Sequence, residues 1–296
     1  MGNSTIFTGA GVAIVTPMTP DGRVNYEKYR ELIDWQIENS TDAIITCGTT
    51  GESSTLEHEE HTEVIKTAIE QTRGRVPVIA GTGSNDTAYC IELSQEAQRL
   101  GADALLLVTP YYNKTSQRGL IAHYTAVADA VELPIILYNV PSRTGVNILP
   151  ETVAELAKHP RIVALKEATG SIASAAKVAS LCDIDIYSGN DDQIVPILSL
   201  GGKGVISVLS NVVPQETHDI CAKWFEGDVA ASRDLQLRYL SLCSALFCDV
   251  NPIPVKEAMN QMGLDVGPCR LPLCDMDEKG KAMVAAALKQ HGLIAG

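Results

Sequence analysis

The feature that most constrains this chain is an eightfold repeat of short apolar runs with amphipathic stretches between them. The runs are nearly continuous in aliphatic residues rather than alternating, which is typical of parallel strands covered on both faces. They begin at Gly11, Asp42, Val76, Asp103, Pro134, Arg161, Ile184 and Gly204. Strand and helix alternating eight times predicts an α/β fold, the (β/α)8 TIM barrel.

The stretches between the runs carry helical periodicity. The first places Tyr26, Tyr29, Leu32, Ile33 and Ile37 on one face. The alternative fold, a doubly wound sheet, normally shows a glycine-rich fingerprint after its first strand. Here GTGSND at 81–86 follows the third run and lacks the third glycine, so it indicates a loop.

The chain after the eighth run has only helical spacing, in 217–225, 229–247, 254–262 and 276–290, punctuated by Pro and Gly. We therefore expect two units, a catalytic barrel over 1–225 and a C-terminal helical region over 226–296.

Charge and composition exclude several kinds of partner. The 296 residues carry a formal net charge of −13 without a Lys/Arg cluster, which disfavours a nucleic-acid surface or an anionic membrane. We see neither a membrane-length apolar run nor a signal peptide. Eight cysteines without a CxxC pair indicate reduced thiols, so we expect a cytoplasmic protein.

Polar residues gather where five of the runs end. In a barrel the carboxyl ends of the strands meet at one mouth, and chemistry takes place there. The segments at these ends are 48–52, 109–113, 138–145, 166–167 and 188–192.

Lys166 interrupts an apolar run where the strand is still enclosed. By strand alternation Ile162, Ala164 and Lys166 share one face, so an inward Ala164 implies an inward Lys166. Burial can lower a lysine pKa by up to about 3–5 units, and a neutral amine forms Schiff bases with carbonyls. The alternative is a lysine that snorkels to the rim and pairs with Glu167 or Asp191, or that binds a phosphate or carboxylate.

Three further features at the mouth suit that chemistry. Tyr138 ends the neighbouring strand, and its phenol can move protons beside the amine. The Gly48–Gly51 turn offers N–H groups and two hydroxyls to a small carboxylate, and Arg143 can grip another. Each feature also has a purely structural interpretation. Tyr138 would be an interior aromatic ring, the Gly48–Gly51 segment a plain turn, and Arg143 a partner in a surface ion pair.

Metal and serine-hydrolase chemistry find little support. His58 and His61 form His-Glu-Glu-His rather than HExxH, with no obvious third ligand, so we expect them on a solvated helix face. The GxSxG elbow is absent.

Six motifs, in order between residues 11 and 273, resemble the dihydrodipicolinate synthase family. They are GTTGES at 48–53, TPYYN at 109–113, YNVPSRTG at 138–145, LKEATG at 165–170, GVISV at 204–208 and NPIPVK at 251–256. That family belongs to the pyruvate-dependent class I aldolases, which also include N-acetylneuraminate lyase. The resemblance implies a lyase that condenses pyruvate with L-aspartate 4-semialdehyde, the first committed step of the diaminopimelate route to lysine, without a metal or organic cofactor.

The resemblance also implies site roles. Lys166 forms the imine with pyruvate, Tyr138 donates and accepts protons, and Thr49 and Tyr112 complete the relay. Thr50 holds the pyruvate carboxylate, and the backbone of Ile206 lines the same pocket. Arg143 receives the carboxylate of the semialdehyde, and Gly189 is a further substrate-binding residue. Tyr112 reaches into a neighbouring subunit, which implies a homo-oligomer, at least a dimer and commonly a tetramer built as a dimer of dimers.

One part of the family pattern is broken. Members inhibited by L-lysine bind it through residues matching Ser53, Ser54, His58, Asn85 and Tyr111. The glutamate that meets the inhibitor's amine is replaced here by Tyr89. We therefore expect weak lysine inhibition, with a cation–π contact as a partial substitute.

Two rival functions fit these residues less well. Aldolases of the superfamily that act on sugar acids usually have Ser-Thr in place of Thr49-Thr50 and lack an arginine placed like Arg143. A catalytically silent barrel used for binding or assembly would not need Lys166 and Tyr138 intact. Both comparisons favour the synthase.

Overall fold

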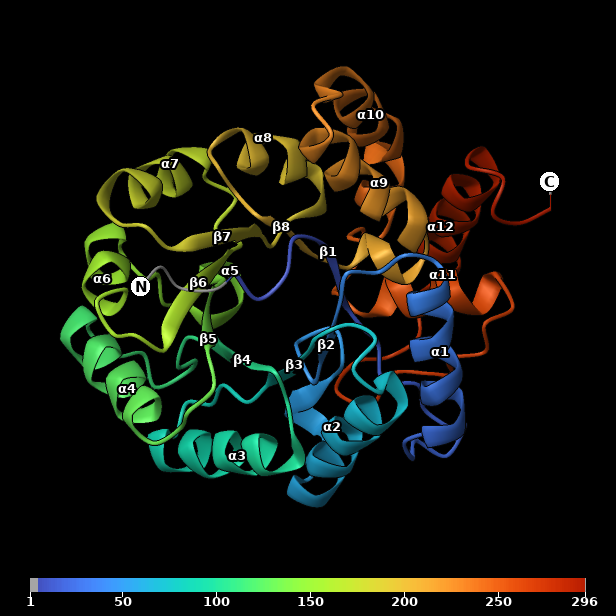
Figure 1. The fold of residues 1–296 in the computed structure, drawn as a ribbon. Helices are drawn as coiled ribbons and strands as arrows, with labels where there is room; N and C mark the ends of the chain where they lie inside the picture. Colours follow the sequence, from blue (N-terminus) through green and yellow to red (C-terminus); the bar gives the residue numbers. More distant parts are fainter. Residues whose placement is uncertain (1–4, 296) are drawn as a thin grey trace.

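Eight parallel strands close into a barrel in chain order in the computed structural model, which describes residues 5–295 (Figure 1). The closed order confirms the TIM barrel and rules out the doubly wound sheet. The strands are β1 (Gly9–Ala13), β2 (Ala43–Thr46), β3 (Val78–Gly81), β4 (Ala104–Val108), β5 (Ile135–Asn139), β6 (Ile162–Glu167), β7 (Asp185–Ser188) and β8 (Gly204–Ser207).

An outer ring of helices encloses the strands (Figure 1). It consists of α1 (Tyr26–Glu38), α2 (His58–Thr72), α3 (Thr87–Leu100), α4 (Gln117–Asp129), α6 (Pro150–Leu156), α7 (Ile172–Leu181), α8 (Ile194–Ser199) and α9 (Pro214–Phe225). A four-residue helix, α5 (Pro141–Thr144), is inserted directly after β5. Several helices begin at a residue whose side chain caps the first turn, such as Asn25 before α1 and Asp86 before α3.

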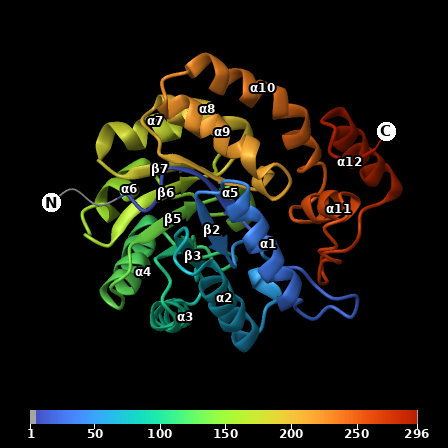
Figure 2. The ribbon, with the colours of Figure 1, turned by 45° about the vertical axis from the view of Figure 1, so that its right-hand side comes forward.

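Three more helices follow the barrel; in Figure 2 α10 runs along the top and α11 and α12 lie on the right. They are α10 (Val229–Ala245), α11 (Ile253–Gln261) and α12 (Glu278–Gln290), close to the ranges expected from sequence. The boundary at residue 225 stays a prediction, although buried hydrogen bonds from this region reach the barrel, as described below. Over residues 5–295 no helix has both the length and the hydropathy to cross a membrane.

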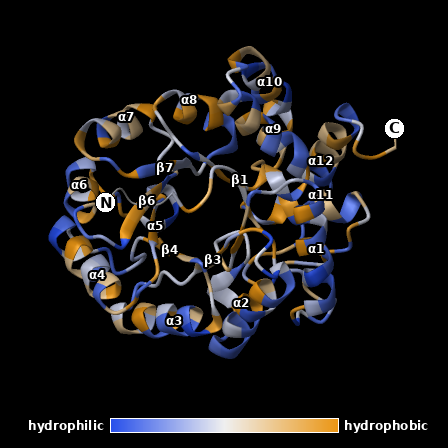
Figure 3. Ribbon diagram, viewed as in Figure 1, coloured by the Kyte–Doolittle hydropathy of each residue, from blue (hydrophilic) through white to orange (hydrophobic). Residues whose placement is uncertain are grey.

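The core has two layers. Side chains inside the barrel, such as Ile45, Leu106 and Ile206, form one cluster, whereas the outward faces of the strands pack with the surrounding helices in another. Hydrophilic residues recur along the outer helices (Figure 3). Phe7 belongs to the inner cluster, where its ring stacks on Tyr187 with 4.4 Å between centroids.

A register shift in β6 corrects one sequence inference. Ile135 pairs with Ile162, but the next residue of β5, Ile136, pairs with Ala164. This irregularity leaves Ile162 in the outer layer and both Val163 and Ala164 in the inner one. The shared face predicted for Ile162 was therefore wrong. Beyond the shift the strands pair regularly, with Lys166 opposite Tyr138.

Candidate active site

Lys166 is buried inside the barrel mouth, with only 6% of its surface exposed. Its Nζ lies 4.2 Å from the centroid of the Tyr138 ring. Within residues 5–295 it makes no ion pair with Glu167 or Asp191, which argues against a rim lysine held by those carboxylates. The arrangement gives a buried amine with a phenol beside it, as imine chemistry requires.

The two carboxyl groups near Lys166 are held by backbone donors instead. Glu167 Oε1 accepts a hydrogen bond from the Thr169 N–H at 2.7 Å. Asp191 Oδ2 accepts from the N–H groups of Val208 and Leu209, at 3.0 and 2.9 Å. Burial raises the pKa of both carboxyls, and for Asp191 a side-chain hydrogen bond with Ser207 and the two backbone N–H groups oppose the rise.

The Thr49–Thr50 turn follows β2 after a residue with an unusual backbone conformation. Cys47, immediately after the strand, has φ of +53°, a left-handed conformation uncommon outside glycine. Thr50 is buried, and its Oγ1 accepts a hydrogen bond from Asn251 Nδ2 at 3.0 Å. Thr49 and Tyr138 line a common space of about 30 Å³. The two are therefore close neighbours at the mouth.

Arg143 stands in α5, just beyond the end of β5, and is exposed. Its Nη2 donates to the Asn251 carbonyl at 3.2 Å. Asn251 thus contacts both Arg143 and Thr50, the two residues predicted to bind carboxylates. Sequence reasoning gave Asn251 no role, although it opens the motif NPIPVK.

Gly189 lies directly after β7, and Ile206 lies on β8. The Gly189 N–H donates to the Glu167 carbonyl at 2.7 Å, and a Cβ at Gly189 would lie 2.6 Å from that of Ala168. Only glycine allows the chain to pass so close to the end of β6. Ile206 lies on β8 in the inner cluster.

Tyr112 is the outlier among the predicted site residues. Its side chain is 88% exposed, and its φ is +69°, which is unusual for a bulky residue. Within one chain it is therefore not part of the enclosed mouth. Backbone strain of this kind persists where the surroundings enforce it, often at functional sites.

A second cavity of about 340 Å³ joins the mouth to most of the predicted effector residues. Thr49 and Arg143 line it, together with Ser53, Ser54, Tyr89 and Tyr111. His58 and Asn85 are not among its lining residues. The His58 ring lies 5.9 Å from the Tyr89 ring, and the Asn85 carbonyl accepts from Asn113 Nδ2 at 2.9 Å. Burial, helped by nearby negative charges, raises the pKa of Tyr89.

His61 corrects a second expectation. It is buried rather than solvated, with Nε2 2.8 Å from the Gly81 carbonyl, because the side chain turns from α2 towards the end of β3. Burial lowers its pKa to about 4. In the part of the chain that the structure describes, no cluster of three His, Cys, Asp or Glu side chains is arranged to hold a metal ion.

Comparison with known proteins gives matches over nearly the whole chain. Residues 6–291 match the Dihydrodipicolinate synthetase family. The 4-hydroxy-tetrahydrodipicolinate synthase of Lachnoclostridium phytofermentans is 62% identical over 292 residues, 98% of this chain and 99% of that protein.

Solved structures agree with this match. A chloride-inhibited dihydrodipicolinate synthase from Acinetobacter baumannii, complexed with pyruvate, superposes with a TM-score of 0.95 at 47% identity, covering 98% of this chain and 100% of the other. The enzyme from Thermotoga maritima superposes with a TM-score of 0.96 at 42% identity, with the same coverage.

Proposed function

The chain belongs to the dihydrodipicolinate synthetase family, and we propose that it carries out the synthase reaction through an imine between pyruvate and Lys166. The reaction condenses pyruvate with L-aspartate 4-semialdehyde to 4-hydroxy-tetrahydrodipicolinate, in the diaminopimelate route to lysine. The observation that carries the proposed role is the buried Lys166 amine, 4.2 Å from the Tyr138 ring and without an ion pair to Glu167 or Asp191 in residues 5–295.

The first half of the reaction makes a carbon nucleophile. The neutral Lys166 amine attacks the ketone carbon of pyruvate, and loss of water leaves the imine. The protonated imine then withdraws electrons from the neighbouring methyl carbon, which loses a proton to give the enamine. The lysine imine is itself the electron sink, so the proposed chemistry needs no metal or organic cofactor.

The second half joins the substrates and frees the enzyme. The enamine carbon attacks the aldehyde carbon, and the aldehyde oxygen takes a proton to become a hydroxyl. The amino group of the former semialdehyde then attacks the imine carbon, closes the ring and displaces the Lys166 amine. We assign these proton transfers to Tyr138, because its phenol borders both the amine and Thr49.

Two sites divide the carboxylates between them. Thr50 and the Ile206 backbone are proposed to hold pyruvate and Arg143 the semialdehyde, with Gly189 as a further substrate-binding residue. The shared contact with Asn251 supports this division, because it fixes Thr50 and Arg143 relative to each other.

Assembly completes the proposed site. Tyr112, exposed and strained in a single chain, is proposed to enter the site of a neighbouring subunit and complete the relay with Thr49 and Tyr138. This makes a dimer the smallest active unit and a dimer of dimers the proposed tetramer. A cytoplasmic location is part of the proposal, because all eight cysteines are thiols, which a reducing compartment preserves.

Borohydride trapping tests the role of Lys166. Reduction in the presence of pyruvate should add the reduced pyruvyl group to the peptide that contains Lys166. Lys166→Ala should abolish the adduct and most turnover while keeping the fold, since it removes a buried amine. Lys203→Ala is the matched control. An adduct on Lys203 or Lys256, or none on the wild type, would refute the assignment.

A further inference from the structure

Two of the eight cysteines are neighbours in the segment after α11. Cys269 and Cys274 both line a cavity of about 20 Å³, which has room for about one water molecule. The segments 267–269 and 274–276 contribute to its wall together with one face of α11. The two segments therefore run past the same helix face, and each brings a thiol to the same small space.

A hydrogen-bonded turn separates the two thiols. The Leu273 N–H donates to the Arg270 carbonyl at 3.0 Å, which closes a four-residue β-turn over 270–273. Cys269 and Cys274 directly flank this turn. In a hairpin the pair that flanks such a turn has Cα atoms about 4.5 Å apart, and a disulfide typically joins Cα atoms about 4.4–6.8 Å apart. The flanking positions therefore suit a disulfide.

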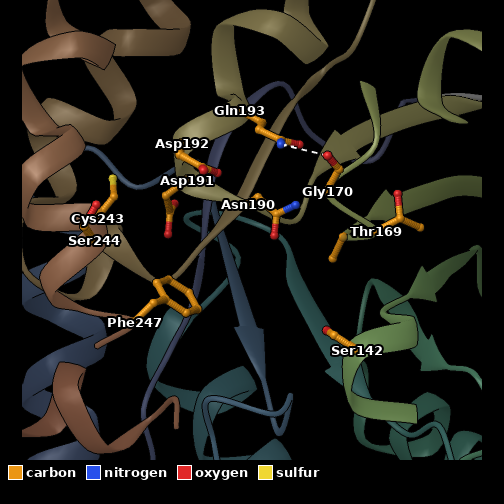
Figure 4. Close-up of a pocket in the computed structure, with 11 residues that line it drawn as sticks. Ser142, Thr169, Gly170, Asn190, Asp191, Asp192, Gln193, Cys243, Ser244 and Phe247 are labelled. Carbon is orange, nitrogen blue, oxygen red and sulfur yellow. Dashed lines mark hydrogen bonds between the residues drawn. The ribbon is translucent and has the colours of Figure 1, made fainter. Parts of the chain in front are cut away.

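Cys243 provides a contrast (Figure 4). It lies near the end of α10 in the wall of a separate cavity of about 350 Å³, and no other described residue of that wall is a cysteine. Cys243 is also buried. A single buried thiol has no second sulfur in its cavity wall, so the shared cavity is what distinguishes Cys269 and Cys274 as a pair.

The two thiols differ in their access to solvent. Cys274 is exposed, whereas Cys269 is partly buried. Burial, with the negative charge of Glu52 as the next contribution, raises the pKa of Cys269 to about 12. Because the thiolate is the reactive form, an oxidant in solution reacts first at Cys274, and Cys269 is then the resolving thiol.

We propose that Cys269 and Cys274 are a redox modification site, which forms a disulfide on exposure to hydrogen peroxide and so protects Cys274 from irreversible oxidation. The Cys274 thiolate attacks one peroxide oxygen, the O–O bond breaks, and hydroxide leaves, which gives a sulfenic acid. The Cys269 sulfur then attacks the Cys274 sulfur, the S–O bond breaks, and water leaves with the Cys269 proton. The two thiols together lose two electrons and two protons, and one peroxide is reduced to two waters.

The disulfide would fasten a turn that already contacts the barrel mouth. Arg270, the first residue of the turn, donates its N–H to Glu52 Oε2 at 2.8 Å and its guanidinium to the Glu60 carboxylate at 2.6 Å. Glu52 belongs to the segment 48–52, which carries the proposed pyruvate-binding threonine. Because the flanking residues are already neighbours, closing the turn should preserve these contacts and leave pyruvate trapping on Lys166 intact.

Mass spectrometry of the full-length protein tests the pair. The folded protein is treated with hydrogen peroxide, its remaining thiols are blocked with N-ethylmaleimide, and it is then denatured and digested with trypsin without a reductant. Trypsin cuts after Arg270, between the two cysteines, so a disulfide holds peptides 257–270 and 271–279 together. The linked mass should equal the sum of both peptides less two hydrogen atoms, and dithiothreitol should separate them.

Three variants assign the roles of the two thiols. In Cys269→Ser the Cys274 sulfenic acid has no resolving partner, so Cys274 should advance to the irreversible sulfinic and sulfonic acids. Fragment spectra distinguish this oxygen from oxygen on Met276, which lies in the same peptide. In Cys274→Ser the Cys269 thiol should stay unoxidised at the same peroxide dose. Cys243→Ser, which removes a buried thiol from a different cavity, is the matched control and should keep the linked peptides.

Three results would overturn the proposal. They are a treated wild type without linked peptides, whether Cys274 stays reduced or becomes a sulfinic acid, a disulfide from either cysteine to a different one such as Cys248, and a linked protein that no longer traps pyruvate on Lys166. The peptide masses do not depend on the proposed function. Failure of the untreated wild type to trap pyruvate would refute that function and leave the test of the disulfide unaffected.

Discussion

Lys256→Met should destabilise the protein strongly, because it leaves a carboxylate buried without its counter-charge. Lys256 Nζ lies 2.8 Å from Glu52 Oε1, and the two side chains are 2% and 1% exposed. The amine also donates to the carbonyls of Thr16 and Pro268, at 3.1 and 2.6 Å. In the variant Glu52 would keep only the Arg270 N–H, which binds Oε2 at 2.8 Å.

Breaking a buried pair from one side typically costs about 3–5 kcal/mol. For a chain of 296 residues, an unfolding entropy of about 2.1 cal/mol/K per residue converts this cost to a fall of roughly 5–8 °C in Tm. Thermal unfolding followed by circular dichroism measures it. Lys158→Met, which breaks an exposed pair with Glu155, should shift Tm by no more than about 1 °C.

The double variant Glu52→Gln/Lys256→Met separates the stranded charge from the lost packing. Glutamine is neutral and can still accept from Arg270, so the double variant should recover at least half of the lost Tm. If Lys256→Met alone shifts Tm no more than Lys158→Met, or if the double variant is less stable than the single one, the reasoning from buried charge is wrong.

Three further outcomes are expected. Arg143→Ala should raise the KM for the semialdehyde by about 10- to 150-fold, because it removes a charge-assisted contact worth about 1.5–3 kcal/mol. Borohydride trapping of pyruvate should be preserved. Equal damage to the use of both substrates would make Arg143 a structural residue. Tyr89→Glu should tighten inhibition by L-lysine by roughly 5- to 150-fold in an inhibition titration. Tight inhibition of the wild type that the substitution leaves unchanged would contradict the role of Tyr89. His61 has a folded pKa of about 4, below its ordinary 6.5, so the unfolded chain takes up the proton first as pH falls. Lowering the pH from 7 to 5 should therefore reduce the free energy of unfolding, measured in urea, by about 2 kcal/mol through His61. His61→Gln should remove that loss.

The barrel is predictable because its strands are buried on both faces and therefore appear as uninterrupted apolar runs. The same property hides the irregularity in β6. Ile162, Val163, Ala164 and Leu165 are all apolar, so a shift of one residue changes no visible pattern. The α5 helix is also invisible to periodicity, because four residues make a single turn.

Candidate site residues are predictable where a polar side chain breaks an apolar strand, as Lys166 does. Residues whose role depends on distant contacts are not. Asn251 meets Thr50 across 201 positions of sequence, and nothing in either local pattern indicates the partner. His61 was placed on a solvated face because helical spacing cannot show that its ring reaches the Gly81 carbonyl.

These distant contacts change how the C-terminal region is understood. Asn251 and Lys256 both follow α10, and they hold Thr50 and Glu52, two residues of one turn after β2. Asn251 also accepts from Arg143, after β5. The C-terminal region therefore fixes two separate edges of the barrel mouth relative to each other. Truncating it would disorder both proposed carboxylate sites even if the eight strands still closed, so the C-terminal region contributes to the proposed active site as well as to the fold.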